Sequence, residues 1–335
     1  MNRLITLEEH YSSPVINQKA AAWLAKDGLS SGFNDAQGNG GEMARLVQHI
    51  DEERIAYMDE TGIDMQVISI VGNVPSQLDA KYAVPLCREA NDEMAALTGK
   101  YPGRFAVFAN LPLADGQAMA AELERCVREH HFVGAMLAGH YKGIPYDDAA
   151  FEPLFAKAEE LDVPLYLHPG LVDPVIRKKY YQGSWSDKVG FELAGFGIGW
   201  HYDVGMQVIR LILAGVFDRH PQLKVIIGHW GEVVAYFMDR LDEISQADTG
   251  LLKPISQYFE DNVYVNPSGM TYDANFRYCL ARFGADHILW GQDYPYRRPE
   301  NIRSFLEDAN LSTADKEKIA HGNAERLLKL DRLPQ

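Results

Sequence analysis

The feature that most constrains the fold is a regular alternation of strand-like and helix-like segments along nearly the whole chain. Short apolar runs, typical of strands buried on both faces, are each followed by a longer stretch with helical periodicity. Strands are predicted at 4–10, 64–70, 104–110, 133–138, 163–167, 223–227, 262–266 and 287–291. Helices are predicted at 42–61, 79–100, 115–130, 147–162, 202–219 and 273–283, after residue 231, and in the last part of the chain.

Eight strand–helix units predict an α/β protein with a (β/α)8 TIM barrel, formed by one domain over residues 1–335. A doubly wound sheet would need a G-x-G-x-x-G phosphate-binding turn after an early strand, and the sequence has none. Two long connections, 11–41 and 171–200, follow the first and fifth strands. They are expected to be loop insertions over the active end of the barrel, and the first is a candidate lid.

Charge and composition exclude several classes of partner. The formal net charge of -15 opposes binding to nucleic acid or to anionic membranes. Apolar runs are too short to span a membrane, and the N-terminus lacks the pattern of a signal peptide.

The three cysteines show no paired-ligand spacing, which predicts buried, reduced packing residues. A cytoplasmic protein that binds neither nucleic acid nor membranes is therefore expected.

Potential metal ligands follow several of the predicted strands. Glu8 and His10 end the first strand, and strand alternation predicts that they point the same way. His168 ends the fifth strand, His229 follows the sixth and Asp293 follows the eighth. In a (β/α)8 barrel these strand ends meet at one face, and imidazole nitrogens and carboxylate oxygens are ligands for divalent ions. The pattern predicts a metal site there.

The sequence resembles the amidohydrolase superfamily, and within it the branch of hydroxybenzoate decarboxylases that act on γ-resorcylate or 2,3-dihydroxybenzoate. The first strand of this branch ends in Glu-x-His, as at Glu8 and His10, where most of the superfamily has His-x-His. The resemblance spans nearly the whole chain and rests on the motifs LEEH at 7–10, FVGA at 132–135, LDVPLYLHP at 161–169, GVFDRHP at 215–221, GHWGE at 228–232, DYP at 293–295 and NAER at 323–326.

The resemblance implies a role for each matching residue. Glu8, His168 and Asp293 correspond to metal ligands, with His10 as a fourth ligand or close neighbour, and His229 with Glu232 corresponds to a catalytic pair one helical turn apart. Asp293 is expected to protonate the ring carbon that bears the carboxylate. The implied cofactor is one divalent ion, Zn²⁺ as first choice and Mn²⁺ as second, and the implied assembly is a homodimer or homotetramer.

The chain departs from the branch around the expected substrate. Gly170 stands where the branch has Arg after His-Pro, and Ala138 stands where it has Asn. Both departures remove groups suited to carboxylate and phenol recognition. His140, just beyond the fourth strand, is a candidate to replace part of this recognition. Tyr294 and Tyr296 are candidates to line the pocket for the aromatic ring.

Two other functions compete with metal-dependent decarboxylation of a small hydroxylated aromatic acid. A hydrolase of the same fold would split a lactone, ester or amide with a metal-bound hydroxide and Asp293 as base. The departures at Gly170 and Ala138 keep that alternative open. A barrel that has lost catalysis and serves as a scaffold would have no need for the ligand set.

Overall fold

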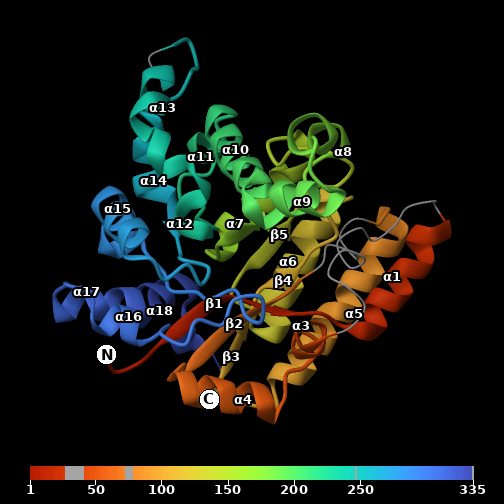
Figure 1. The fold of residues 1–335 in the computed structure, drawn as a ribbon. Helices are drawn as coiled ribbons and strands as arrows, with labels where there is room; N and C mark the ends of the chain where they lie inside the picture. Colours follow the sequence, from red (N-terminus) through yellow and green to blue (C-terminus); the bar gives the residue numbers. More distant parts are fainter. Residues whose placement is uncertain (27–40, 72–77, 246, 334–335) are drawn as a thin grey trace.

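The computed structural model describes residues 1–26, 41–71, 78–245 and 247–333, and Figure 1 shows its helices arranged around central strands. The strand pairings form a closed ring. The strands pair in parallel in the orders β1-β2-β3 and β4-β5-β6-β7-β8. Parallel bridges from Val265 to Ile288 and from Leu7 to Gly291 close the ring. The strands are β1 Ile5–Tyr11, β2 Met65–Ile70, β3 Phe105–Val107, β4 Ala109–Asn110, β5 Ala135–Ala138, β6 Leu165–His168, β7 Val225–Ile227 and β8 Val263–Val265.

This architecture confirms the predicted (β/α)8 barrel, with two local differences. The predicted strand 104–110 is interrupted at Phe108, so that β3 pairs with β2 and β4 pairs with β5. The predicted eighth strand, 287–291, is present only as the two closing bridges. Both differences reflect curvature, because a closing sheet bends its strands and interrupts their hydrogen-bond ladders.

Helices surround the ring and mostly lie where the sequence predicts them. The predicted helix 42–61 is wrong as one element, because it breaks before Asp51, whose carboxylate caps a new helix at the backbone N–H groups of Glu53 and Arg54. The longer helices are α1 Pro14–Lys26, α4 Glu52–Thr61, α5 Ala80–Thr98, α6 Gly116–His130, α7 Glu152–Leu161, α10 Gly199–Leu213, α13 Met238–Ser245, α14 Ile255–Asn262 and α15 Asp273–Phe283.

Shorter helices fill most of the remaining connections. They include α3 Glu42–Leu46, α11 Val216–Arg219, α12 His229–Glu232, α16 Ser304–Glu307, α17 Thr313–Glu317 and α18 Asn323–Leu328. The connection 171–200 is not an irregular loop, because it contains α8 Pro174–Ile176, η2 Arg177–Tyr181, α9 Asp187–Glu192 and η3 Leu193–Gly197. In Figure 1 α8 and α9 lie beside α10. The candidate lid at 11–41 begins with α1, and its residues 27–40 lie outside the described part of the chain.

Two apolar clusters stabilise this arrangement. The smaller one includes Ile5, Val67, Phe108, Met136 and Ile226, whose side chains come from different segments around the ring and fill its inside. The larger one packs the outer faces of the strands against the helices. Because every strand is buried on both faces, the continuous apolar runs of the sequence are explained. No helix among the described residues is both long and apolar enough to cross a membrane, and the three cysteines are buried and free.

Candidate metal centre

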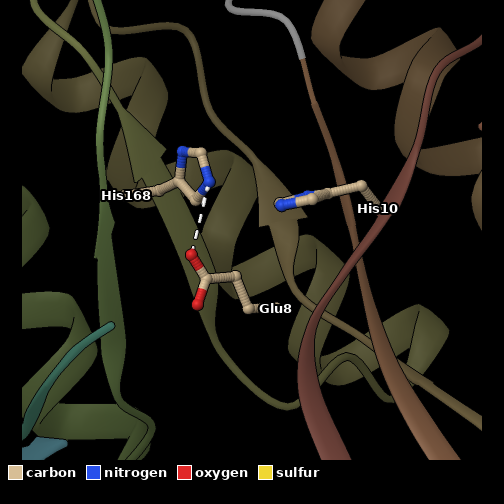
Figure 2. A group of neighbouring side chains, drawn as sticks. All are labelled: Glu8, His10 and His168. Carbon is tan, nitrogen blue, oxygen red and sulfur yellow. Dashed lines mark ion pairs between the residues drawn. The ribbon is translucent and has the colours of Figure 1, made fainter. Parts of the chain in front are cut away.

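Three of the predicted ligands meet at the carboxyl ends of β1 and β6. Glu8 Oε1 lies 3.5 Å from His168 Nε2, and the rings of His10 and His168 face each other edge-on with centroids 4.9 Å apart. One ligand atom from each of the three residues falls within 4.8 Å of the other two. Figure 2 shows the three side chains pointing toward a common centre. The convergence predicted from the sequence is therefore present.

Asp293 lies two residues after Gly291, which pairs with Leu7 to close the ring, and its carboxylate is next to this group. Its Oδ1 lies 3.1 Å from His10 Nε2, and its side chain is 16% exposed, whereas the side chains of Glu8 and His10 are fully buried. Asp293 is therefore the member of the group nearest to solvent, which is the position expected for a group that meets a substrate.

Glu8 reaches the centre through an irregular backbone rather than through regular alternation. The pairing of β1 with β2 shifts between Thr6 and Glu9, and Glu8 has a positive φ of 63°. A positive φ is strained for a residue with a side chain and is found at functional sites. The expectation of a regular strand through Glu8 is wrong, although its consequence, that Glu8 and His10 converge, is correct.

Hydrogen bonds leave one atom of each ligand free to face the centre. His10 Nδ1 pairs with Ser69 Oγ at 3.2 Å, and His168 Nδ1 donates to the carbonyl of Pro169 at 2.7 Å. Each bond leaves Nε2 as the ring atom that faces the centre. Within the described residues, neither Glu8 Oε1 nor His10 Nε2 has a hydrogen-bond partner. Buried polar atoms without partners are costly unless something else binds them.

The second carboxylate oxygen of Glu8, Oε2, accepts hydrogen bonds from two side chains. Tyr166 Oη donates to Glu8 Oε2 at 2.6 Å, and Ser268 Oγ donates to the same atom. Asn266 Nδ2 in turn donates to Tyr166 Oη at 2.7 Å. Oε1 is therefore the atom of Glu8 that points at His168. Sequence reasoning missed Tyr166 and Ser268, because an isolated Tyr inside a strand and a Ser in a loop carry no spacing signal.

The protonation states suit a divalent cation. Burial lowers the pKa of His10 and the pKa of His168 to about 4, so both rings are neutral near pH 7. Neutral imidazoles have a lone pair for a cation, and two carboxylates balance its charge. Together with the unpartnered atoms of Glu8 and His10, this donor set fits one divalent ion held by Glu8, His10, His168 and Asp293.

His229 lies beside this centre on an unusual turn. Residues 229–233 all have positive φ, from 48° at His229 to 88° at Gly231, so α12 is a left-handed turn. The predicted right-handed helical turn between His229 and Glu232 is wrong. Left-handed residues cost roughly 1–2 kcal/mol each, and tertiary bonds hold the turn: Trp230 N–H donates to the Asn266 carbonyl and His229 N–H to Ser268 Oγ.

The turn brings His229 and Glu232 together as predicted. His229 Nδ1 lies 2.6 Å from Glu232 Oε1 and 4.0 Å from Glu8 Oε1. Burial opposes ionisation of both groups, but their mutual attraction dominates. It raises the pKa of His229 to about 10, aided by Glu8, and lowers the pKa of Glu232 to about 2, aided by His201. The pair is therefore an imidazolium bonded to a carboxylate, and it lies beside the candidate ligand Glu8.

His201 is a member of this group that sequence reasoning missed. Its Nδ1 lies 2.6 Å from Glu232 Oε2, so that Glu232 is held between two imidazoles. His201 stands in the first turn of α10 after a tryptophan, where no motif singles it out.

Glu9 is a second residue whose role only the structure reveals. Its carboxylate is buried and accepts hydrogen bonds from the backbone N–H groups of Gln292 and Tyr294, which flank Asp293. Arg54, also buried, donates to the carbonyl of His10 at 2.8 Å. Burial raises the pKa of Glu9 to about 8. Together these two residues join the end of β1 to the Asp293 segment.

The three residues predicted near the substrate have different surroundings. The ring of Tyr296 lies 5.7 Å from that of His10, at the centre. Tyr294 is 1% exposed and packs between Tyr57 and the guanidinium of Arg54, which is a core position. His140 Nε2 pairs with Asp203 at 2.6 Å, and its Nδ1 is buried without a hydrogen-bond partner in the described parts of the chain.

The barrel and the ligand set define a metal-dependent enzyme with its active site at the carboxyl ends of the strands. The family model described as Amidohydrolase matches residues 20–330. The decarboxylase orsB of Emericella nidulans is 36% identical over 98% of this chain and 97% of its own length. The γ-resorcylate decarboxylase of a Polaromonas species is 32% identical over 99% of this chain and 100% of its own length.

A solved structure agrees with these relatives. The dihydroxybenzoic acid decarboxylase of Polaromonas, solved with bound manganese and the inhibitor 2-nitroresorcinol, superposes with a TM-score of 0.85 at 30% identity. The match covers 99% of this chain and 98% of that one. The chain belongs to the amidohydrolase family. It is a metal-dependent decarboxylase, a carbon–carbon lyase, of that superfamily, as the motifs predicted.

Proposed function

We propose that this enzyme removes the carboxylate of a small hydroxylated aromatic acid as carbon dioxide, without an oxidant. The observation that carries the proposal is the group formed by Glu8, His10, His168 and Asp293, in which Glu8 Oε1 and His10 Nε2 are buried and make no hydrogen bond to any described residue. The relatives' substrates, γ-resorcylate and dihydroxybenzoate, supply the substrate class.

Glu8, His10, His168 and Asp293 are proposed to hold one divalent ion. A mixed set of nitrogen and oxygen ligands accepts Zn²⁺ as well as Mn²⁺. The manganese bound in the Polaromonas structure favours Mn²⁺ over the Zn²⁺ that the sequence placed first. When bound, such an ion would supply Lewis-acid chemistry to a substrate that carries a carboxylate and an ortho hydroxyl group.

Asp293 is proposed as the proton donor. Burial raises its pKa to about 7, although His229 and Arg297 oppose this shift, so that its carboxyl is able to carry a proton near neutral pH. Transfer of that proton to the ring carbon bearing the carboxylate breaks the aromaticity of the ring. The carbon–carbon bond then breaks, its electron pair restores the aromatic ring, and carbon dioxide leaves.

His229 and Glu232 are proposed to assist this step. The imidazolium of His229 lies next to the ligands and is suited to stabilise negative charge that develops on the phenol oxygen. Glu232 bonds its Nδ1 and thereby fixes the ring orientation. Tyr296 is proposed to contact the aromatic ring and His140 to contribute to polar recognition, whereas the packing of Tyr294 assigns it to the core.

The chain is proposed to form a homodimer or homotetramer. The segment 174–206 and the short helix η4 Val234–Phe237 expose several large apolar side chains, which a subunit contact would bury. They are Val175, Ile176, Tyr180, Trp185, Val189, Phe196, Tyr202, Met206, Tyr236 and Phe237. Light scattering of the purified protein tests this assembly directly.

A substrate screen in ¹⁸O-labelled water tests the proposed reaction. Protein loaded with Mn²⁺ or Zn²⁺ is given mono- and dihydroxybenzoates and, separately, aryl esters and lactones. Carbon dioxide release from a hydroxybenzoate, without ¹⁸O in the phenol product, is the expected result. Ester or lactone cleavage that incorporates ¹⁸O, with no carbon dioxide from any acid, would establish the hydrolase instead.

A further inference from the structure

Helix α10 contacts Oε2 of Glu232, the carboxylate oxygen that His229 does not bond. His201 Nδ1 lies 2.6 Å from Glu232 Oε2, while His229 Nδ1 lies 2.6 Å from Oε1. Glu232 is fully buried, so water does not compete for either oxygen. Since a carboxylate only accepts hydrogen bonds, both imidazoles donate to it from Nδ1.

The backbone of α10 is adapted to the same turn. Gly205 follows His201 by one helical turn and therefore lies on the same face of α10. A Cβ atom at Gly205 would lie 2.5 Å from the carbonyl oxygen of Glu232. Side chain and backbone of one helix face thus both contact Glu232.

The other ring nitrogen of His201, Nε2, contacts the connection 171–200. This atom lies 3.1 Å from Trp200 Nε1 and 3.2 Å from the carbonyl of Phe196 in η3. The ring therefore connects the segment 193–200 with the carboxylate that orients His229.

We propose that His201 is a positioning residue, which fixes Glu232 and through it the orientation of the His229 imidazole. The turn at 229–233 is left-handed and strained, so polar contacts are needed to keep Glu232 in place. Without His201 one oxygen of a buried carboxylate loses its hydrogen bond, and Glu232 is free to rotate away from His229. The inference deepens the proposed function, because it concerns the group that is proposed to assist decarboxylation.

Three substitutions distinguish positioning from simple packing. The amide nitrogen of an asparagine lies close to the position of imidazole Nδ1, whereas that of a glutamine reaches the position of Nε2. His201→Asn therefore keeps a donor for Glu232, while His201→Gln and His201→Ala do not. Leu213→Ala, at an exposed position near the end of the same helix, is the control.

Two readouts are taken on each variant. The first is kcat and KM for the best hydroxybenzoate, with metal content measured in parallel. The second is the Nδ1–H proton resonance of His229 in protein loaded with diamagnetic Zn²⁺ and labelled with ¹⁵N-histidine. We expect kcat to fall about 10- to 100-fold in the Gln and Ala variants, with KM and metal content nearly unchanged and the resonance shifted. The Asn variant should stay close to wild type in both readouts.

The inference is overturned if His201→Ala keeps the wild-type kcat and resonance, or if the Asn variant is as impaired as the Gln variant. If the Ala variant does not fold, the comparison of Asn with Gln decides alone. A wild-type protein that releases no carbon dioxide would refute the proposed function, whereas the His229 resonance would still test the positioning.

Discussion

The carboxylate of Glu9 accepts a hydrogen bond from the backbone N–H of Tyr294 at 3.1 Å, across 285 positions of sequence. The neighbouring N–H of Gln292 binds the other oxygen at the same distance. Glu9 thereby fixes the backbone on both sides of Asp293 while its neighbours Glu8 and His10 face the centre. The end of the first strand thus carries two of the proposed ligands, Glu8 and His10, and also positions a third, Asp293.

Replacement of Glu9 by Gln should weaken both the fold and the metal site. Below its pKa of about 8 the Glu9 carboxyl still offers one oxygen to each N–H group, whereas an amide places its own N–H donor against one of them, which costs about 1–3 kcal/mol. Thermal unfolding and Mn²⁺ titration measure the two effects. Glu89→Gln, at an exposed ion pair with Lys19, is the matched control. An unchanged melting temperature and an unchanged affinity for Mn²⁺ in Glu9→Gln would argue against this role.

The stability contributed by Glu9 should depend on pH. Burial raises its pKa from 4.5 to about 8, so the folded state binds this proton more tightly than the unfolded chain. Its contribution is fully present below pH 4.5 and is lost as the pH rises through about 8. The unfolding free energy of wild type relative to Glu9→Gln should therefore fall over this range, measured by denaturant titration with a chelator present. A constant difference would contradict the raised pKa.

Tyr166→Phe should lower metal affinity without unfolding the barrel. The hydroxyl donates to Glu8 Oε2 and directs Oε1 toward His168. Loss of such an orienting bond typically weakens metal binding about 10- to 100-fold. Competition between the protein and a chelating dye for Zn²⁺ and Mn²⁺ measures this effect. Tyr264→Phe, on β8, serves as the control, and equal affinities of the two variants would refute the role of Tyr166.

Gly205→Ala should reduce activity by displacing α10 from Glu232. The new Cβ would lie 2.5 Å from the Glu232 carbonyl oxygen and 2.8 Å from Val234 Cγ2, so the helix or the turn must shift. Such overpacking costs about 1–3 kcal/mol. Gly322→Ala, whose Cβ would have only ordinary contacts, should be harmless in the same assay of kcat and melting temperature. Wild-type activity in Gly205→Ala would contradict this prediction, because it would show that catalysis does not depend on the close contact between α10 and Glu232.

The barrel was predictable because its signals are local. Apolar runs and helical periodicity mark each unit, and the strand ends then bring Glu8, His10, His168 and Asp293 to one face. The break before Asp51 was also visible in principle, since Asp is a preferred helix cap followed here by two Glu residues.

The supporting residues were not predictable from the sequence, because their roles depend on tertiary contacts. His201 reaches Glu232 from another helix, and Glu9 reaches Tyr294 in the neighbouring segment where the ring closes. The left-handed turn at 229–233 contradicts local propensity and persists only because distant residues bond its backbone. Such exceptions to local rules are expected at functional sites.

The most direct test of the central claim is a titration of metal-stripped protein with Mn²⁺, following carbon dioxide release from a hydroxybenzoate that the screen identifies. The four converging side chains predict that activity rises from near zero and saturates at one ion per chain, and that Glu8→Gln greatly weakens this response. Full activity in the metal-stripped protein, or an unchanged titration in Glu8→Gln, would contradict the account.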